Sequence, residues 1–295
     1  MTFSAITTVI SAAANYDLTD LATVKNELSI IQPGNDAWLG RAINQVSKSI
    51  SSYLKRVMVP EVVQDTFDFQ GQPWRHRSVR SLPELQLTRW PILGVVSVVQ
   101  TNSSGAPVTL TEGTDFRVNT ETGTLLRLNS IGLGSLWEAE PVTVIYMAGY
   151  GAKVSEAHTV PATPYQITVS QSVAFSCDYS VAYANGTKLT RVSASPSTGQ
   201  YSVAAGVYTF AAADAGQSLT IIYGAKSAPV DITEVCLRLV TARFRAKDRD
   251  PALVQQETPG VGTQRWWIGS TPGQHSPFTP DIEFMLEPYV MPVVA

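Results

Sequence analysis

Apolar positions recur with helical spacing at both ends of this chain and with strand spacing between them. The first helical segment is predicted over Leu18–Ile30, and Pro33-Gly34 ends it. A second helix opens at Asn35 or Asp36, since either side chain can accept hydrogen bonds from the first turn. Its apolar stripe consists of Leu39, Ile43, Val46, Ile50 and Leu54. The pattern predicts an antiparallel helical hairpin.

After the hairpin the spacing becomes that of strands. The segments that alternate or are rich in β-branched residues are Val62–Gln70, Leu85–Gln100, a hairpin within Gly113–Arg127, and Val142–Met147. We expect these segments to form a small β unit.

A second strand-rich region, Tyr165–Tyr223, carries almost no charge. Its short strands are predicted at Gln166–Ser170, Val181–Tyr183, Lys188–Val192, Gln200–Val203, Val207–Phe210 and Leu219–Tyr223. Asn185-Gly186 and Ala205-Gly206 are turn signals between them. The pattern predicts an all-β module, either a sandwich or a barrel.

Helical spacing returns after this module, in a third helix that ends near Asp250-Pro251. Asp231 and Glu234 are spaced as a capping box at its start. Before the module, Gly149–Pro164 is predicted to be an exposed loop, where domain insertion is best tolerated. We therefore expect an α+β fold in which a host domain, residues 1–154 and 227–295, is interrupted by a β module at residues 155–226.

The composition limits the classes of protein. The 295 residues are 44% hydrophobic and only 15% charged, with a net charge of -3. A low charged fraction is consistent with surface buried against other subunits, or with a β-rich protein full of Ser and Thr. No overall attraction to nucleic acid follows. Cys177 and Cys236 lie in different kinds of segment, which favours a reducing compartment. We expect no signal peptide and no membrane span.

Groups for catalysis are sparse. The three histidines, His76, His158 and His275, have no second ligand at metal-binding spacing. Neither a phosphate-binding glycine loop nor a nucleophile elbow is present. We expect no catalytic residues, no cofactor and no metal. A hydrolase that uses Asp and Glu alone is a third alternative that no feature favours.

Two groups of side chains are candidates for contacts with other molecules. The basic residues at helical spacing are Arg41, Lys48, Lys55, Arg238, Arg245 and Arg249. They face a DNA channel, solvent, or acidic residues of a neighbouring subunit. The aromatic residues of the Gly- and Pro-rich C-terminal segment include Trp266, Trp267, Phe278 and Tyr289. They either pack on the chain's own core or anchor to a partner.

Several segments together resemble the head–tail connector (head-completion adaptor) family of tailed bacteriophages. They are Asp20-Leu-Ala-Thr-Val-Lys25, Asn35-Asp-Ala-Trp-Leu39, Ile50-Ser-Ser-Tyr-Leu-Lys-Arg56, Leu87-Thr-Arg-Trp-Pro-Ile-Leu93, Asp115-Phe-Arg-Val118, Val142-Thr-Val-Ile-Tyr-Met-Ala-Gly-Tyr150, Pro229-Val-Asp231 with Arg245-Ala-Lys-Asp-Arg-Asp250, and Pro280-Asp-Ile-Glu-Phe-Met-Leu-Glu-Pro-Tyr289. Each pattern is short, and their shared order carries the resemblance.

The resemblance implies a structural virion protein rather than an enzyme. It implies a ring, usually of twelve subunits, that docks beneath the portal, continues the DNA channel without specific DNA binding, and meets a neck or tail protein. Assembly would occur in the host cytoplasm. Because the family's C-terminal segment commonly engages the portal, Trp266, Trp267, Phe278 and Tyr289 become portal-contact candidates.

The β module departs from the compact family pattern. Gln200-Tyr-Ser-Val203, Gly206-Val-Tyr-Thr-Phe210 and Asp214-Ala-Gly216 resemble immunoglobulin-like modules of phage structural proteins. We expect the module to project outward from the ring. The alternative function is carbohydrate or receptor binding through this module, with Tyr183, Tyr201 and Tyr208 stacking on sugars, although strand tyrosines also serve in core packing.

Overall fold

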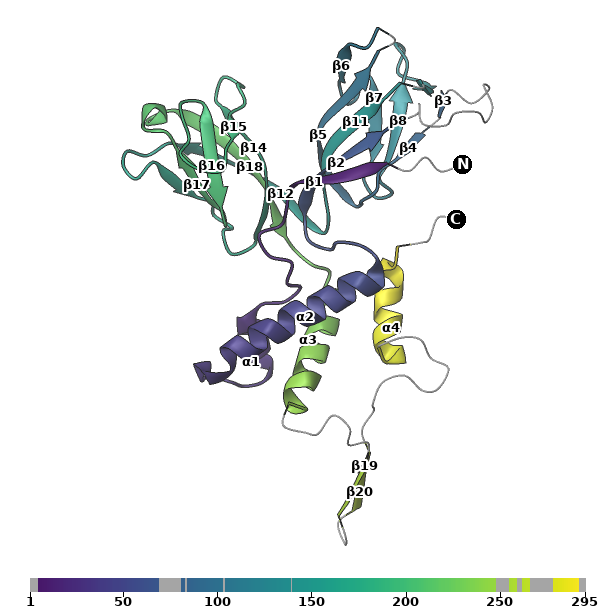
Figure 1. The fold of residues 1–295 in the computed structure, drawn as a ribbon, viewed down its shortest axis with the longest axis vertical. Helices are drawn as coiled ribbons and strands as arrows, with labels where there is room; N and C mark the ends of the chain where they lie inside the picture. The colour runs from purple at the N-terminus through teal and green to yellow at the C-terminus, as the bar shows by residue number, and fades with distance from the viewer. Residues whose placement is uncertain are drawn as a thin grey trace. The chain divides into compact units, whose positions relative to one another are not determined.

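The computed structural model describes residues 5–68, 81–82, 84–102, 104–138, 140–247, 255–258, 262–265 and 278–291. The chain forms two compact bodies, each built from segments distant in sequence. The helical body combines Tyr16–Arg56 with Ala228–Ala295, and the β body combines Met1–Asn15 with Val57–Ser227. Figure 1 shows the α-helices and the larger sheets, which together confirm the α+β class. The three-part boundaries expected from the sequence stay a prediction.

The described residues of the helical body form four α-helices, two short 3-10 helices and one β-hairpin. They are α1 (Leu21–Glu27), η1 (Pro33–Asn35), α2 (Asp36–Leu54), α3 (Val230–Arg245), β19 (Gln255–Thr258), β20 (Gly262–Arg265), α4 (Pro280–Leu286) and η3 (Glu287–Tyr289). The predicted stripe of α2 is confirmed, because all five of its apolar residues are buried. This stripe gives α2 one side to pack and leaves the opposite side in solvent.

The first helix is shorter than the predicted Leu18–Ile30. Asp20 caps it by accepting a hydrogen bond from the Thr23 amide at 2.8 Å, so the helix begins at Leu21. At its other end Ser29 has a φ of 55°, which helical backbone cannot adopt. Leu18 is buried outside the helix, where its amide donates to Ser47 Oγ of α2 at 3.0 Å.

The third helix begins without the predicted capping box. Pro229 occupies the cap position and no side chain caps the helix. Asp231 accepts a hydrogen bond from the Tyr289 hydroxyl at 3.2 Å, and Glu234 pairs with Arg238 at 2.6 Å. Both carboxylates therefore have other partners. The buried side of α3 is formed by Ile232, Val235, Cys236, Val240 and Thr241.

The β body begins with a five-stranded sheet of order β1-β2-β11-β5-β6. Its strands are β1 (Ile6–Ser11), β2 (Glu61–Phe67), β5 (Ile92–Thr101), β6 (Pro107–Leu110) and β11 (Val142–Ala148). A second sheet has the order β4-β8-β7 and consists of β4 (Glu84–Gln86), β7 (Phe116–Asn119) and β8 (Thr124–Leu128). The short strand β9 (Gly134–Ser135) pairs with β8. A separate pair is formed by β3 (Ser81–Leu82) and β10 (Trp137–Glu138). The predicted hairpin within Gly113–Arg127 is confirmed as β7 and β8, which pair from Phe116 with Arg127 to Asn119 with Thr124. The strand β8 extends one residue beyond the predicted range, to Leu128.

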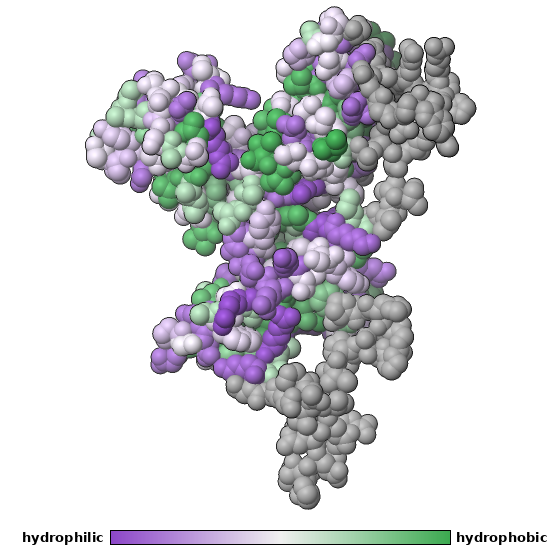
Figure 2. Space-filling model, in the orientation of Figure 1, coloured by the Kyte–Doolittle hydropathy of each residue, from purple (hydrophilic) through white to green (hydrophobic). Residues whose placement is uncertain are grey.

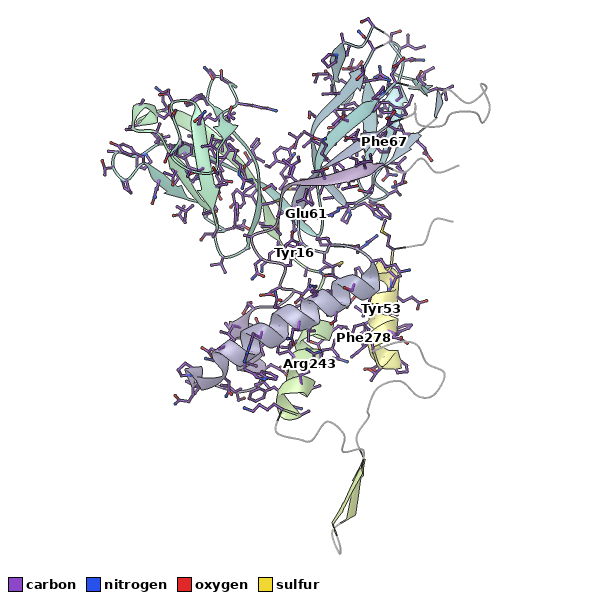
Figure 3. The ribbon with its side chains drawn as sticks, viewed as in Figure 1. Tyr16, Tyr53, Glu61, Phe67, Arg243 and Phe278 are labelled. Carbon is purple, nitrogen blue, oxygen red and sulfur yellow. The ribbon has the colours of Figure 1, made fainter. Side chains whose placement is uncertain are left out.

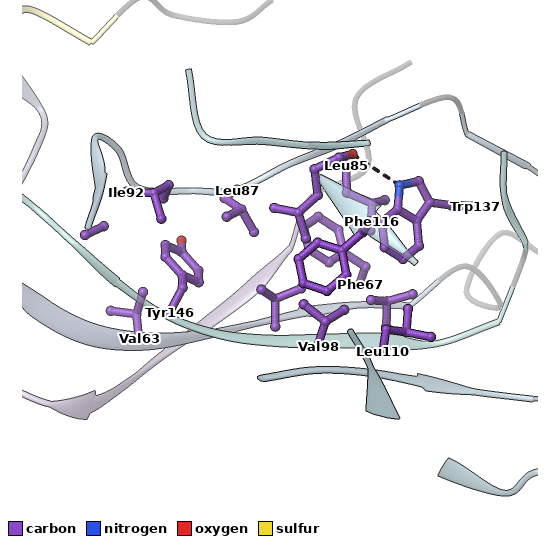
Figure 4. Packing of buried hydrophobic residues seen from close by; sticks show 14 residues of the cluster. Val63, Phe67, Leu85, Leu87, Ile92, Val98, Leu110, Phe116, Trp137 and Tyr146 are labelled. Carbon is purple, nitrogen blue, oxygen red and sulfur yellow. Dashed lines mark hydrogen bonds between the residues drawn. The ribbon is translucent and has the colours of Figure 1, made fainter. Parts of the chain in front are cut away.

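Side chains from these strands bury one core, drawn in Figure 4. Phe67, Phe116 and Trp137 are among its largest fully or almost fully buried side chains. The Trp137 indole also donates to the Leu125 carbonyl at 3.2 Å, which satisfies its one polar atom. The alternation read from the sequence thus places large apolar side chains on the inner faces of strands.

A buried carboxylate joins three parts of this core. Asp65 on β2 is 0% exposed and accepts hydrogen bonds from the Tyr146 hydroxyl at 2.7 Å and from Thr7 Oγ1 at 2.7 Å. The amide and hydroxyl of Thr88 donate to it at 2.8 and 2.9 Å. Burial and the nearby Asp65 charge raise the pKa of Tyr146, so the phenol stays a donor. Asp65 therefore holds β1, β11 and the segment after β4 around β2.

The β module is a second set of strands, in two sheets of order β12-β18-β14 and β13-β17-β16-β15. The strands are β12 (Gly151–Thr159), β13 (Gln166–Thr168), β14 (Phe175–Tyr183), β15 (Thr190–Arg191), β16 (Gln200–Ala204), β17 (Val207–Phe210) and β18 (Ser218–Lys226), with the 3-10 helix η2 at Ala212–Asp214. The segments predicted around β13, β16, β17 and β18 are confirmed.

The predicted exposed loop over Gly149–Pro164 is wrong for most of its length. Residues Gly151–Thr159 form β12, which pairs with β18 along all nine positions. Its residues alternate between exposed and half-buried, as in a strand with one solvated face. The polar side chains of exposed Lys153 and of half-buried Glu156 and His158 made this strand resemble a loop in the sequence.

The β module packs against the five-stranded sheet within the same body. Cys177 on β14 is buried with Val62 and Met147 in a shared apolar cluster. The Tyr179 hydroxyl donates to the Val95 carbonyl at 2.5 Å, and Ser176 Oγ donates to the Pro60 carbonyl. Burial raises the pKa of the Cys177 thiol to about 12, so this thiol is neutral. The contact combines apolar packing with direct hydrogen bonds to the backbone of the neighbouring sheet.

Glu156 on β12 organises the edge of the β module. It accepts hydrogen bonds from Ser170 Oγ, from the Tyr223 hydroxyl at 2.6 Å and from His158 Nε2 at 2.9 Å. Burial opposes the charge, yet the hydrogen bonds from Ser170, Tyr223 and His158 outweigh it and lower the pKa of Glu156 to about 2. The carboxylate is therefore stabilised in the charged form.

Replacing Asp65 by Asn should destabilise the β body by about 2–4 kcal/mol, because an amide cannot accept four hydrogen bonds in a buried site. Urea denaturation of the full-length chain measures the change. Glu84→Gln, on an exposed position of β4, is the matched control and should change the free energy of unfolding by less than about 0.5 kcal/mol. Equal effects of the two substitutions would contradict the role given to Asp65.

Glu156 should contribute acid-dependent stability. The unfolded chain takes up the proton near pH 4.5 and the folded chain only near about 2, so the contribution is full above pH 4.5 and is lost as the pH falls to about 2. Glu156→Gln should be less stable than the parent at pH 7, with the difference shrinking over that window. Urea midpoints at several pH values test this, and a difference independent of pH would contradict it.

Candidate subunit-interaction surface

The exposed side of α2 carries two basic residues seven positions apart, Arg41 and Lys48, and Lys55 follows the last residue of the helix as its C-cap. Arg41, Lys48 and Lys55 are all exposed, whereas the buried stripe of the same helix faces the core. The remaining exposed positions of α2 are Ala37, Asn44, Gln45, Ser49 and Ser52. None of these is acidic, so this side of α2 is basic along its length. Figure 2 shows hydrophilic side chains over the helical body in the same view.

Two of the three basic residues predicted on one side of α3, Arg238 and Arg245, are exposed at heptad spacing on the helix. Arg238 pairs with Glu234 one turn earlier at 2.6 Å, which neutralises it locally. Arg245 is exposed in the last turn, and Arg249 lies outside the described residues. Arg238 is therefore matched on its own helix, while Arg245 remains part of a basic helix end.

Two basic residues not singled out in the sequence extend this end of α3. Arg243 donates to Gln45 Oε1 of α2 at 3.3 Å, and Lys247 donates to Asn35 Oδ1 at 3.0 Å. Figure 3 labels Arg243 beside α2. Arg243 lies in the last turn of α3 and Lys247 follows it, and the helix dipole stabilises cations at this end of a helix. This position was the signal in the sequence that could have identified the two residues. The C-terminal end of α3 thus adds positive charge next to the first half of α2.

The acidic residues nearest to these helices are mostly engaged. Asp36 pairs with Lys25 at 2.7 Å, and Asp20 caps α1. Asp17 accepts a hydrogen bond from Asn44 at 3.4 Å. Glu27 at the end of α1 is exposed. Arg41 and Lys48 on α2, with the end of α3, define a surface that we call the basic face.

Acidic residues gather at the other end of α3. Asp281, Glu283 and Glu287 belong to α4 and η3, and Tyr289 brings η3 to Asp231 at the start of α3. Hydrogen bonding to Thr279 and the charge of Arg238 lower the pKa of Asp281, despite a small opposing effect of burial. Two large apolar side chains in this region are exposed, Phe284 by 76% and Val230 by 83%. We call this region the acidic face.

The two faces lie toward opposite ends of α3. A helix of 16 residues spans about 24 Å, with Asp231 in its first turn and Arg243 and Arg245 in its last. Both faces belong to one body, which is held by the contacts between α2, α3 and α4. On α3 negative charge therefore lies in the first turn and positive charge in the last, and the helical body carries one surface of each sign.

Two of the aromatic candidates in the C-terminal segment have described positions. Phe278 is 5% exposed and meets the Tyr53 ring edge-on, with ring centroids 5.1 Å apart, as Figure 3 shows. Burial raises the pKa of Tyr53, and Glu283 and Glu287 raise it further. Tyr289 is half-buried and contacts Asp231. Phe278 thus packs on the chain's own core, and Trp266 and Trp267 lie outside the described residues.

The tyrosines considered for sugar stacking have different positions. Tyr201 and Tyr208 are buried, and their hydroxyls donate to the buried Asp178 at 2.7 and 2.9 Å. Burial raises the pKa of Asp178 despite these two hydrogen bonds. These two rings cannot stack on a ligand without leaving the core. Tyr183 alone of the three is partly exposed.

Within the described residues, no cluster of three or more His, Cys, Asp or Glu side chains could hold a metal ion. His158 is bound to Glu156, and His76 and His275 lie outside those residues. Among the described helices, none is both long and apolar enough to cross a membrane.

No family model matches the sequence, and no curated protein matches it. Among solved structures, the chain is similar to one described as "Neck of empty GTA particle computed with C6 symmetry". The sequences are 13% identical, the TM-score is 0.34, and the match covers 50% of this chain and 72% of that chain. The likeness is therefore slight.

Replacing Phe278 by Ala should destabilise the helical body by about 3–4 kcal/mol, because it leaves a cavity against Tyr53. Phe284→Ala removes the same side chain from an exposed position of α4 and should change the stability by less than about 0.5 kcal/mol. Hydrogen exchange of α2 amides measures both effects. Similar exchange rates in the two variants would show that Phe278 does not anchor the C-terminal segment.

Proposed function

We propose that this protein is a structural subunit of a phage neck, a head–tail connector that forms a ring beneath the portal and continues the DNA channel. The polarised helical body is the observation that carries the proposal. A ring subunit contacts its two neighbours through two different surfaces, one on each side. The acidic face of one subunit and the basic face of the next fit that requirement.

The order of elements supports the same function. The segments that resemble the connector family include those that form α1, α2, α3 and α4. These segments come from both ends of the chain and yet form one body. The resembling segments at the two ends of the chain therefore fold together in the helical body. The other resembling segments, Leu87–Leu93, Asp115–Val118 and Val142–Tyr150, lie in the β body, which also contains the β module.

A passive role toward DNA also fits the charges. A net charge of -3 provides no overall attraction to phosphates. The basic face supplies positive charge only locally, and pairing it with acidic side chains of a neighbouring subunit would leave the channel wall close to neutral. A wall that binds phosphates weakly allows DNA to pass, since each neutralised phosphate adds salt-dependent affinity.

Charge reversal on either face should prevent ring formation. An acidic-face variant, Asp281→Lys with Glu287→Lys, and a basic-face variant, Arg41→Glu with Lys48→Glu, each place like charges at the contact. Each pair of like charges at the contact makes the free energy of assembly less favourable. We therefore expect the protein concentration at which half of the chains are assembled to rise at least tenfold. Sedimentation velocity and electron microscopy at low salt measure it. Glu121→Lys with Lys188→Glu, at exposed positions of the β body, is the control.

Mixing the two variants gives the sharpest result. In the mixture, the reversed acidic face of one variant is positive and meets the reversed basic face of the other variant, which is negative. The unchanged basic face of the first variant meets the unchanged acidic face of the second. Both contacts are attractive, so rings should form again with the two variants alternating. Such rings contain an even number of subunits. Rings in each variant alone would contradict the pairing of these faces but leave the connector function standing. A parent chain that remains monomeric, even with portal present, would contradict the connector function.

A further inference from the structure

A polar pocket of about 560 Å³ lies at one end of the β module. Three segments form it: the end of β14 with its turn, the loop before β16, and η2 with the start of β18. The lining residues are Tyr183, Ala184, Asn185, Thr198, Ala213, Asp214, Gly216, Gln217 and Ser218. This volume falls in the range of small-molecule sites in proteins.

The aromatic residue of this pocket is held in place by a buried carboxylate. Asp214 is 1% exposed, and its Oδ1 accepts the Tyr183 hydroxyl at 2.7 Å. The Gly199 amide approaches the same carboxylate at 3.3 Å. Burial and the bond to Asp214 raise the pKa of Tyr183 to about 12, so its hydroxyl keeps the proton that it donates. The phenol is fixed at its tip while the residue remains partly exposed.

The rest of the pocket is made of neutral polar groups. Asn185, Thr198, Gln217 and Ser218 are exposed there and offer amide and hydroxyl groups that can both donate and accept. Asp214 is the one ionisable acid that lines the pocket, and no Lys or Arg lines it. An anionic ligand would therefore gain no cation and would meet the Asp214 charge.

A fixed aromatic residue beside neutral donors and acceptors fits a neutral saccharide. The C–H faces of a pyranose ring pack on an aromatic ring, and its hydroxyls require groups that donate and accept. A phosphate or a sugar acid requires positive charge, and an apolar ligand would leave the rim amides without partners. We propose that this pocket binds one or two residues of a neutral saccharide.

This site differs from the sugar stacking considered for the three tyrosines. Tyr201 and Tyr208 are unavailable because they hold Asp178 in the core. The proposed site depends on Tyr183 alone, together with the rim amides and hydroxyls. It also lies in the β body, so it is independent of the ring contacts proposed for the helical body.

Saturation-transfer NMR of the full-length protein tests the site with a defined panel: glucose, galactose, N-acetylglucosamine, the disaccharides maltose and lactose, and 3′-sialyllactose as the charged comparison. We expect at least one neutral sugar to bind with a Kd near or below about 1 mM, a common value for weak specific sites. The charged sugar should bind at least tenfold more weakly than its neutral counterpart, lactose.

Three variants locate the site. Tyr183→Ala and Gln217→Ala should each weaken the binding at least tenfold, and Tyr183→Phe should weaken it less, because the ring remains and only the bond to Asp214 is lost. Gln166→Ala removes an exposed amide from β13 of the same module and should leave the binding unchanged. The proposal is overturned if no neutral sugar binds at about 10 mM, or if Tyr183→Ala and Gln217→Ala both bind the sugar as tightly as the parent protein does.

Discussion

The packing of α3 on α2 is the contact on which the arrangement of this chain depends. Ser47 and Cys236, which are 189 positions apart, meet at 3.7 Å between their side-chain oxygen and sulfur atoms. Closing so long a loop costs conformational entropy, and the cost is offset by the apolar faces of both helices. Trp38 and Phe244 extend the contact, with ring centroids 5.7 Å apart. The chain between Leu54, the end of α2, and Val230, the start of α3, must therefore begin and end at points that lie close together in space.

The β body meets that requirement through close backbone contacts near Pro60, where the chain has just left α2. A Cβ at Gly151 would lie 2.1 Å from the Ala225 carbonyl oxygen, and one at Gly224 would lie 2.9 Å from Cys177 Sγ. Only glycine permits strands to approach at these distances. The outgoing strand β2 and the strands that lead in and out of the β module therefore gather at one place. The two ends of the β module are neighbours because β12 and β18 pair along nine positions. This geometry is the one expected if the module is an insertion into a host domain.

The sequence was sufficient to predict the elements whose burial is periodic, and insufficient where a polar group decides the structure. The stripe of α2 and the alternation of β11 are repeated signals, and both were predicted correctly. β12 was missed because polar residues such as Lys153, Glu156 and His158 are spread along it, and such a segment resembles a loop when the partner strand is unknown. Asp178 and its two tyrosines could not be foreseen, because their pairing depends on strand register. The acidic face was missed because its members come from α3, α4 and η3, which only folding brings together.

The burial of Phe278 connects stability with assembly. Charge complementarity can select which faces meet, but it fixes no angle between neighbouring subunits, and the same pair of faces at another angle would produce an open filament. The angle between the acidic and basic faces is set by how α4 and η3 pack on α2 and α3. Phe278 against Tyr53, and Tyr289 against Asp231, hold that packing. In the proposed ring, a weakened Phe278 contact would therefore change the closure even if the charges on both faces were intact. The number of subunits would then be a property of the helical core rather than of the surface charges.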